Sequence, residues 1–138
     1  MYTAWEAWVL SQDGGKMKKV DISIDTEALK KIEAIGGRTL VAKMIDVFLI
    51  GAVDKHQKLS SLNLQEPDSM LHEIEMISHT LKSSAAYLGL NELGRQSHLV
   101  EMQSTEKKVD ALQVSVPTLA ATLQASVEAL KQLRKAYS

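Results

Sequence analysis

His79 and the residues that follow it at helical spacing are the part of this sequence best suited to chemistry. Lys82, Ser83 and Ala86 lie three, four and seven residues further on, so on a helix they share the face of His79. A neutral imidazole is a good nucleophile near neutral pH because its intrinsic pKa is about 6.5. The Lys82 ammonium could meet phosphoryl oxygens, and the small Ser83 and Ala86 leave room for a partner. This group could accept a phosphoryl group but could not generate one.

The helix that must carry His79 is expected over residues 67–88. Pro67 suits its first turn and Gly89 its end. At about 100° of rotation per residue, His79 lies roughly 150° from the centre of the apolar stripe. We therefore expect the imidazole to face solvent or a shallow groove. The stripe consists of Leu71, Ile74, Ile77 or Ser78, Leu81, Ala85 and Leu88.

A plain solvated surface is the simpler interpretation of one histidine near one lysine, and spacing alone does not exclude it. Metal binding has less support, because His72 and His79 are seven residues apart, whereas helical ligand pairs usually lie three or four apart. The chain has no cysteine, which excludes disulfides and thiolate sites. No role is expected for His56 or His98, and neither a metal nor another cofactor is predicted.

The composition favours one soluble helical domain. The chain has 138 residues, a formal net charge of -1 and no basic stripe, which argues against nucleic-acid binding. It has no apolar run long enough for a membrane span and no basic, apolar start typical of a secretory signal, so a cytoplasmic protein is expected. Aromatic content is 4% and prolines number two, so Leu, Ala, Met and Ile must form the core.

The pattern along the chain predicts an all-α fold, an antiparallel four-helix bundle with an additional short N-terminal helix. The short helix is expected to begin at Asp25 or Thr26 and to end at Gly36-Gly37. Its apolar residues are Leu29, Ile32 and Ile35.

The bundle helices are expected over residues 38–62, 67–88 and 91–104 and from residue 115 onwards, with a loop at 63–66. Asn91 and Ser115 are the expected caps of the last two helices, and Pro117 would lie in the first turn of the last one.

Residues 1–20 form a separate segment, and residues 21–138 are predicted to be the helical bundle domain. Gly14-Gly15 followed by lysines is typical of a linker. Two interpretations of the segment stay open: a leader that orders only on a neighbour, or a short amphipathic helix. In the second, Trp5 and Trp8 would dock onto the bundle or onto a second chain.

The string HTLKSSAAYLG at residues 79–89 resembles the signature of the histidine-containing phosphotransfer (HPt) family. The matching positions are the phosphoacceptor His79, then Lys82, Ser83 and Gly89. Ser83 stands where the family most often has glycine. Residues 29–48 also look like the short helix, glycine turn and first bundle helix of the family, so the resemblance covers about residues 25–138.

The resemblance further implies that Glu101, on the following helix, orients the imidazole. Glu101 shares a helix face with Gly94 and Ser97, whose small side chains would let the two helices come close.

The function implied by the resemblance is that of a phosphorelay intermediate without kinase activity of its own. His79 would take a phosphoryl group from a receiver-domain aspartate and pass it to another receiver, with Lys82 offsetting phosphoryl charge. The partners would be the receivers of a hybrid sensor kinase and of a response regulator, which would supply Mg²⁺. We expect a monomer that binds neither nucleic acid nor membranes. The docking rim would comprise His72, Glu75, Met76, Lys82, Ser83, Ala86 and Tyr87.

Two alternatives remain at this level. The first is a non-catalytic adaptor of the same fold that binds a response regulator without transfer. The second is a histidine kinase dimerisation fragment, which is disfavoured because the chain has enough helices for a monomeric bundle and no Gly-rich nucleotide-binding segment follows.

Overall fold

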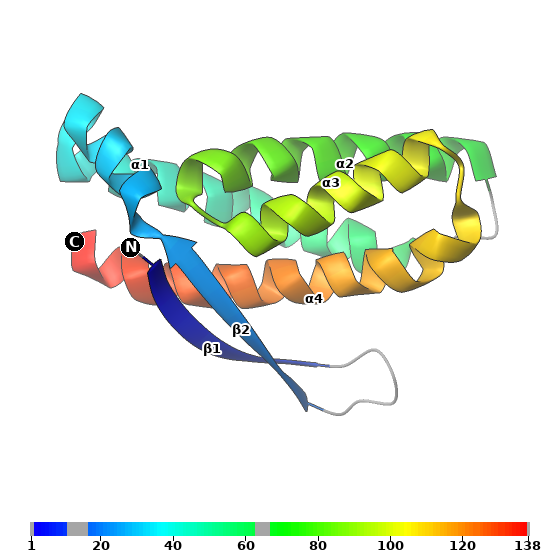
Figure 1. The fold of residues 1–138 in the computed structure, drawn as a ribbon, viewed down its shortest axis with the longest axis horizontal. Helices are drawn as coiled ribbons and strands as arrows, with labels where there is room; N and C mark the ends of the chain where they lie inside the picture. Colours follow the sequence, from blue (N-terminus) through cyan, green and yellow to red (C-terminus); the bar gives the residue numbers. More distant parts are fainter. Residues whose placement is uncertain (1, 11–16, 63–66, 138) are drawn as a thin grey trace.

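The computed structural model describes residues 2–10, 17–62 and 67–137 and places four long helices side by side (Figure 1). They are α1 (Thr26–Ser61), α2 (Pro67–Leu88), α3 (Asn91–Thr105) and α4 (Val109–Arg134), followed by the short 3-10 helix η1 (Lys135–Tyr137). In the packed order, α2 lies between α1 and α3, and α4 lies between α3 and α1. The fold class is all-α, and the predicted four-helix bundle is confirmed.

The helix labelled α1 contains the predicted short helix as its first part. The Asp25 side chain caps it, accepting a hydrogen bond of 3.1 Å from the backbone N–H of Glu27. Gly37 breaks the helical path with φ 74° and ψ -173°, so a short helix precedes a long one. Of its three apolar residues, Leu29 and Ile32 are buried, whereas Ile35, near the end of the short helix, is 84% exposed.

The helix boundaries differ from the prediction at the last two helices. Leu90, not Asn91, is the residue before α3, and it makes no side-chain cap. Helix α4 begins at Val109, six residues before the predicted cap Ser115, and Pro117 lies inside it. Burial of Leu112 and Val116 against the core explains the extension, since the gain in apolar contact outweighs the hydrogen bond that proline cannot make.

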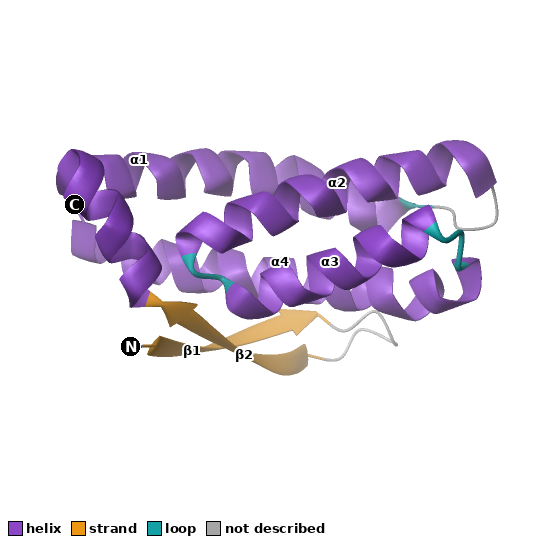
Figure 2. Ribbon diagram, turned by 45° about the horizontal axis from the view of Figure 1, so that its top comes forward, coloured by secondary structure: helices purple, strands orange, loops and turns teal. Residues whose placement is uncertain are grey.

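A two-stranded antiparallel hairpin, β1 (Tyr2–Leu10) and β2 (Met17–Asp25), precedes the helices and was not predicted. Tyr2 pairs with Asp25 and Leu10 with Met17, and both strands lie against α4 (Figure 2). The hypothesis of a short helix within residues 1–20 is therefore wrong. The boundary proposed at residue 20 also falls inside β2.

The alternation in β2 explains this outcome. Val20, Ile22 and Ile24 are separated by single polar residues, which is the period of a strand and not of a helix. Ile22 and Ile24 are 2% and 0% exposed, so this face of the strand completes the core. The predicted linker glycines 14–15 and the loop at 63–66 lie outside the described residues, as do the side chains of Trp5 and Trp8.

The end of α2 is held by β2. Gly89 has φ 73°, a left-handed conformation that ends the helix, and its carbonyl accepts a hydrogen bond of 2.8 Å from the N–H of Asp25. The start of α1 and the end of the His79 helix are thus joined at one point. No helix in the described ranges is both long and apolar enough to cross a membrane.

The two left-handed glycines provide a matched pair of substitutions. A Cβ at Gly89 would overlap the carbonyl oxygen of Asp25, whereas a Cβ at Gly37 would meet nothing within 4 Å. Gly37→Ala should lower the free energy of unfolding by about 1–3 kcal/mol, because φ 74° with ψ -173° is a backbone region adopted almost only by glycine. Gly89→Ala should cost clearly more. Urea unfolding of both variants measures the difference, and equal losses would contradict the contact with Asp25.

Candidate functional site

The site lies between α2 and α3, which are also in close contact further along their length. Gly94 on α3 faces Ala85 on α2, and a Cβ at Gly94 would lie 3.5 Å from the Ala85 Cβ. Ser97, one turn further along α3, is fully buried. The small residues predicted to let these helices come close therefore lie at their contact.

The core side of α2 sets the direction of His79. Leu81 and Ala85 are each 1% exposed, and the buried Ser78 hydroxyl donates to the carbonyl of Ile74 at 2.8 Å. His79 follows Ser78 on the helix and therefore turns away from the core. Its side chain is 65% exposed, which agrees with the outward direction predicted from the apolar stripe.

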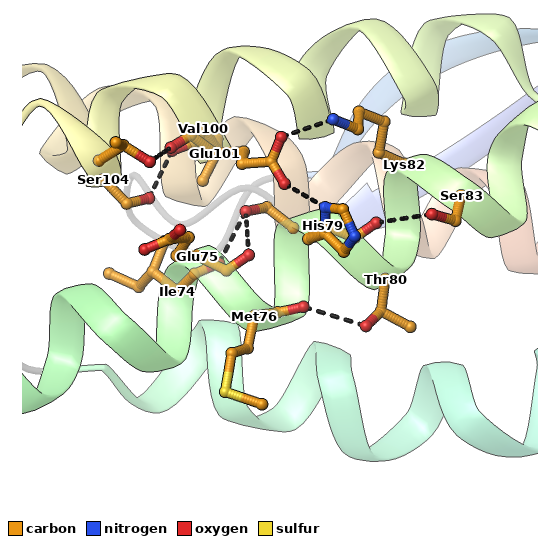
Figure 3. A network of polar contacts seen from close by, with 12 residues as sticks. Ile74, Glu75, Met76, His79, Thr80, Lys82, Ser83, Val100, Glu101 and Ser104 are labelled. Atoms are coloured by element: carbon orange, nitrogen blue, oxygen red, sulfur yellow. Dashed lines mark hydrogen bonds and ion pairs between the residues drawn. The ribbon is translucent and has the colours of Figure 1, made fainter.

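Glu101 on α3 reaches across to two residues of α2 (Figure 3). Its Oε2 lies 2.6 Å from Nδ1 of His79, and its Oε1 accepts a hydrogen bond of 2.6 Å from Nζ of Lys82. The Glu101 side chain is 16% exposed, against 34% for Lys82. One largely covered carboxylate thus connects the imidazole and the ammonium group, each through its own oxygen.

The electrostatics of the site keep Glu101 ionised. The hydrogen bond from Lys82 lowers the pKa of the Glu101 carboxyl; burial opposes this, and the hydrogen bond with His79 adds to the lowering. A carboxylate can only accept hydrogen bonds, so the partner nitrogen Nδ1 must carry the proton. The lone pair of a neutral ring is then on Nε2. Within the described ranges, no hydrogen bond to Nε2 of His79 is found.

The other predicted site residues lie around this centre, on α2. Ser83 is exposed, and its hydroxyl donates to the His79 carbonyl at 3.2 Å. Met76 is 58% and Tyr87 44% exposed, and Met76 projects to the side of α2 away from Glu101 (Figure 3). His72 and Ala86 are also exposed, and Glu75 is partly buried.

Two features of the site were not predicted. The sequence predicts Lys82 as a partner of phosphoryl oxygens and as part of the docking rim, yet it is paired with Glu101. Met102, the residue after Glu101, is 44% exposed and adds apolar surface on α3. The helical phase of α3 carries a signal for Met102, because it lies five residues after the buried Ser97 and so on the outer side of the helix.

The described residues contain no group of three or more His, Asp or Glu side chains placed to hold a metal ion. His98, on α3, is exposed, and His56, on α1, is about half buried, with burial lowering the pKa of its imidazole. Neither makes a contact in the described structure that indicates a role.

The family model of the Hpt domain matches residues 43–133, about two thirds of the chain. The match includes all of α2 and α3 and therefore the three residues His79, Lys82 and Glu101. No curated protein and no solved structure matches the chain.

The pKa of Glu101 provides a test of the pairing. NMR titration of its carboxyl carbon should give a midpoint below the ordinary glutamate value of 4.5. Lys82→Met should return the midpoint towards that value more than His79→Gln does, because the Lys82 hydrogen bond is the larger cause. Equal shifts in the two variants would contradict this order.

Because the pKa of Glu101 is lowered in the folded protein, its contribution to the stability of the fold depends on pH. Glu101 stabilises the fold above its ordinary pKa, and that contribution is lost as the pH falls through the depressed value.

Proposed function

We propose that this chain, which belongs to the Hpt domain family, accepts a phosphoryl group on His79 from a receiver-domain aspartate and passes it to another receiver. Membership of the family implies a phosphotransfer role in a phosphorelay and interaction with receiver domains. Beyond this family role, we propose that His79 is the acceptor, that the partners are the receivers of a hybrid sensor kinase and of a response regulator, and that the protein is cytoplasmic.

The observation that supports this proposal best is the contact between Glu101 and Nδ1 of His79. It holds the imidazole in the tautomer that leaves Nε2 as the nucleophile, and it fixes the plane of a ring that is otherwise 65% exposed. An unassisted surface histidine would share its proton between both nitrogens and rotate freely. The arrangement prepares one nitrogen for attack before a partner arrives.

The transfer step requires little else from this chain. The Nε2 lone pair forms a bond to phosphorus while the bond from phosphorus to the aspartyl oxygen breaks, and that electron pair leaves with the aspartate carboxylate. The Nδ1 proton stays on the ring, hydrogen-bonded to Glu101. Phosphoryl transfer depends on alignment and on neutralising charge on the phosphoryl oxygens. Lys82, one helical turn from His79, is the nearest cation on the same helix.

The receiver would dock over the outward face of α2. Its centre is His79, and its rim comprises His72, Glu75, Met76, Lys82, Ser83, Ala86 and Tyr87. Exposed Met76 and Tyr87 supply apolar contact, and a flexible methionine adapts to more than one partner. Such a mixed surface suits exchange between receivers.

The two alternatives gain no support from the site. A kinase dimerisation fragment needs a second chain to complete its bundle, whereas the helices of this chain bury a common core. A non-catalytic adaptor would not need the contact between Glu101 and Nδ1 of His79. The monomeric state and the domain limits 21–138 stay predictions.

Removal of the acceptor nitrogen tests the assignment. His79→Gln should fold with an unchanged circular dichroism spectrum yet take no label from a phosphorylated receiver or from phosphoramidate, a small phosphoryl donor. Wild type should carry an acid-labile, alkali-stable label. The control is His98→Gln, which alters another exposed histidine and should label normally. Labelling of His79→Gln at the wild-type rate would rule out His79.

The docking surface is tested separately from the chemistry. Ala86→Arg places a bulky charge one heptad after His79 and should slow transfer from a receiver at least about tenfold, equivalent to about 1.4 kcal/mol in the barrier. Labelling by phosphoramidate should persist, because the small donor needs no docking surface. Val114→Arg, at a position on α4 that is 73% exposed, is the control. Unchanged receiver transfer in Ala86→Arg would place the interface elsewhere.

A further inference from the structure

The charges at the site are balanced before any phosphoryl group arrives. Glu101 carries one negative charge, Lys82 carries one positive charge, and the two are in direct contact at 2.6 Å. His79 shares the same carboxylate through its Nδ1 proton and is neutral when its other nitrogen is to attack. In this state Lys82 is therefore paired with Glu101 and is not available to pair with phosphoryl oxygens on His79.

Phosphorylation of His79 would change the balance of charge at the site. A phosphoryl group adds roughly 1.5 to 2 negative charges and three strong acceptor oxygens. Attack by Nε2 while the proton stays on Nδ1 also turns the ring into a cation. The centre then holds two anions, the carboxylate and the phosphoryl group, and two cations, the imidazolium and the ammonium group.

We propose that phosphorylation of His79 makes Glu101 and Lys82 exchange partners. Glu101 releases Lys82 and keeps the imidazolium through Nδ1, while Lys82 moves to the phosphoryl oxygens. Each charged group then has an oppositely charged neighbour both before and after the step. This inference rests on the proposed function and describes how the same site passes between its two states.

The geometry favours movement of Lys82, and not of Glu101, when the partners change. Glu101 is 16% exposed, and each of its oxygens is held by a contact of 2.6 Å, so its carboxylate is more confined than the ammonium group of Lys82. Lys82 is 34% exposed, and a lysine has a four-carbon stem with three donors that can be redirected. It is also three residues after His79 on the same helix, so its ammonium group can reach either partner.

A consequence concerns the lifetime of the phosphoryl group. When Nδ1 keeps its proton, the N–P bond pair returns to Nε2 and the ring departs as neutral imidazole, whereas a ring without that proton would have to depart as the much poorer leaving group imidazolate. A carboxylate that holds the Nδ1 proton therefore keeps the N–P bond ready for onward transfer. An amide at position 101 would still accept the Nδ1 hydrogen bond, but without charge, and it would leave Lys82 unpaired. Glu101 is thus a positioning residue whose charge, and not only its hydrogen bond, has a role.

Nitrogen-15 NMR of protein phosphorylated with phosphoramidate tests the exchange directly. The Lys82 ammonium signal, assigned by its loss in Lys82→Met, should shift on phosphorylation, and the His79 ring should show a protonated Nδ1. The matched control is Lys131, which pairs with Glu128 on α4 and whose signal should stay unchanged. A Lys82 signal that does not move, or a phosphorylated ring that has lost the Nδ1 proton, would overturn the proposal.

Kinetics supply the second measurement. Glu101→Gln should lengthen the half-life of the phosphoryl group by about fivefold, because a neutral amide favours the labile Nδ1-protonated form of the phosphorylated ring less than a carboxylate does. Glu101→Asp should keep part of the wild-type lability, and Lys131→Met should change nothing. A Glu101→Gln half-life equal to that of wild type would refute the role of the charge.

Failure of this proposal differs from failure of the proposed function. If wild-type His79 takes no phosphoryl group from phosphoramidate or from a receiver, the proposed function fails, and this inference fails with it. If His79 is labelled normally while Lys82 stays on Glu101, the partner exchange alone is wrong.

Discussion

The site depends on one carboxylate that spans two helices. Each oxygen of Glu101 meets a different residue of α2 at 2.6 Å, so both contacts form only if the two helices keep their separation and register. The small residues Gly94 and Ala85 let the same two helices approach about two turns away. Burying a carboxylate to 16% exposure would cost free energy without partners, and here His79 and Lys82 satisfy it. The interaction that prepares the imidazole is therefore also one that ties α3 to α2.

The rotation of α2 about its axis is the second constraint, and residues outside the site determine it. Leu81 and Ala85 fix the inner face by burial, and Gly89 fixes the end through the hydrogen bond from Asp25 to its carbonyl. Since Asp25 also caps α1, the hairpin, the first helix and the His79 helix meet at one point. A side chain at Gly89 would push these elements apart, although the atoms that it would meet belong to Asp25 and not to His79, Lys82 or Glu101.

Periodicity predicted the parts of the fold that one segment determines by itself. The stripe through Leu81 and Ala85 correctly placed His79 outward, because burial of that stripe leaves only one orientation for the helix. The short helix ends at Gly37 as expected, because glycine has no Cβ and adopts a positive φ more readily than other residues. The hairpin was missed although Val20, Ile22 and Ile24 alternate with polar residues, since a helical bundle explained the rest of the chain. The start of α4 was placed at Ser115 because a serine before a proline is typical of a cap, whereas core burial of Leu112 decided the boundary.

The position of Lys82 could not be predicted from local pattern, because it depends on two helices at once. Resemblance placed Glu101 near the imidazole, and spacing placed Lys82 on the face of His79, but neither reveals that the two charges meet. Whether residue 101 is a glutamate or a glutamine therefore decides whether Lys82 has a charged partner. An amide could orient an imidazole equally well, since it needs only one acceptor oxygen, but an amide would not hold an ammonium group as an ion pair. A carboxylate at this position joins the orientation of the imidazole to the placement of the ammonium group, so any change in the charge of His79 acts on Lys82 as well.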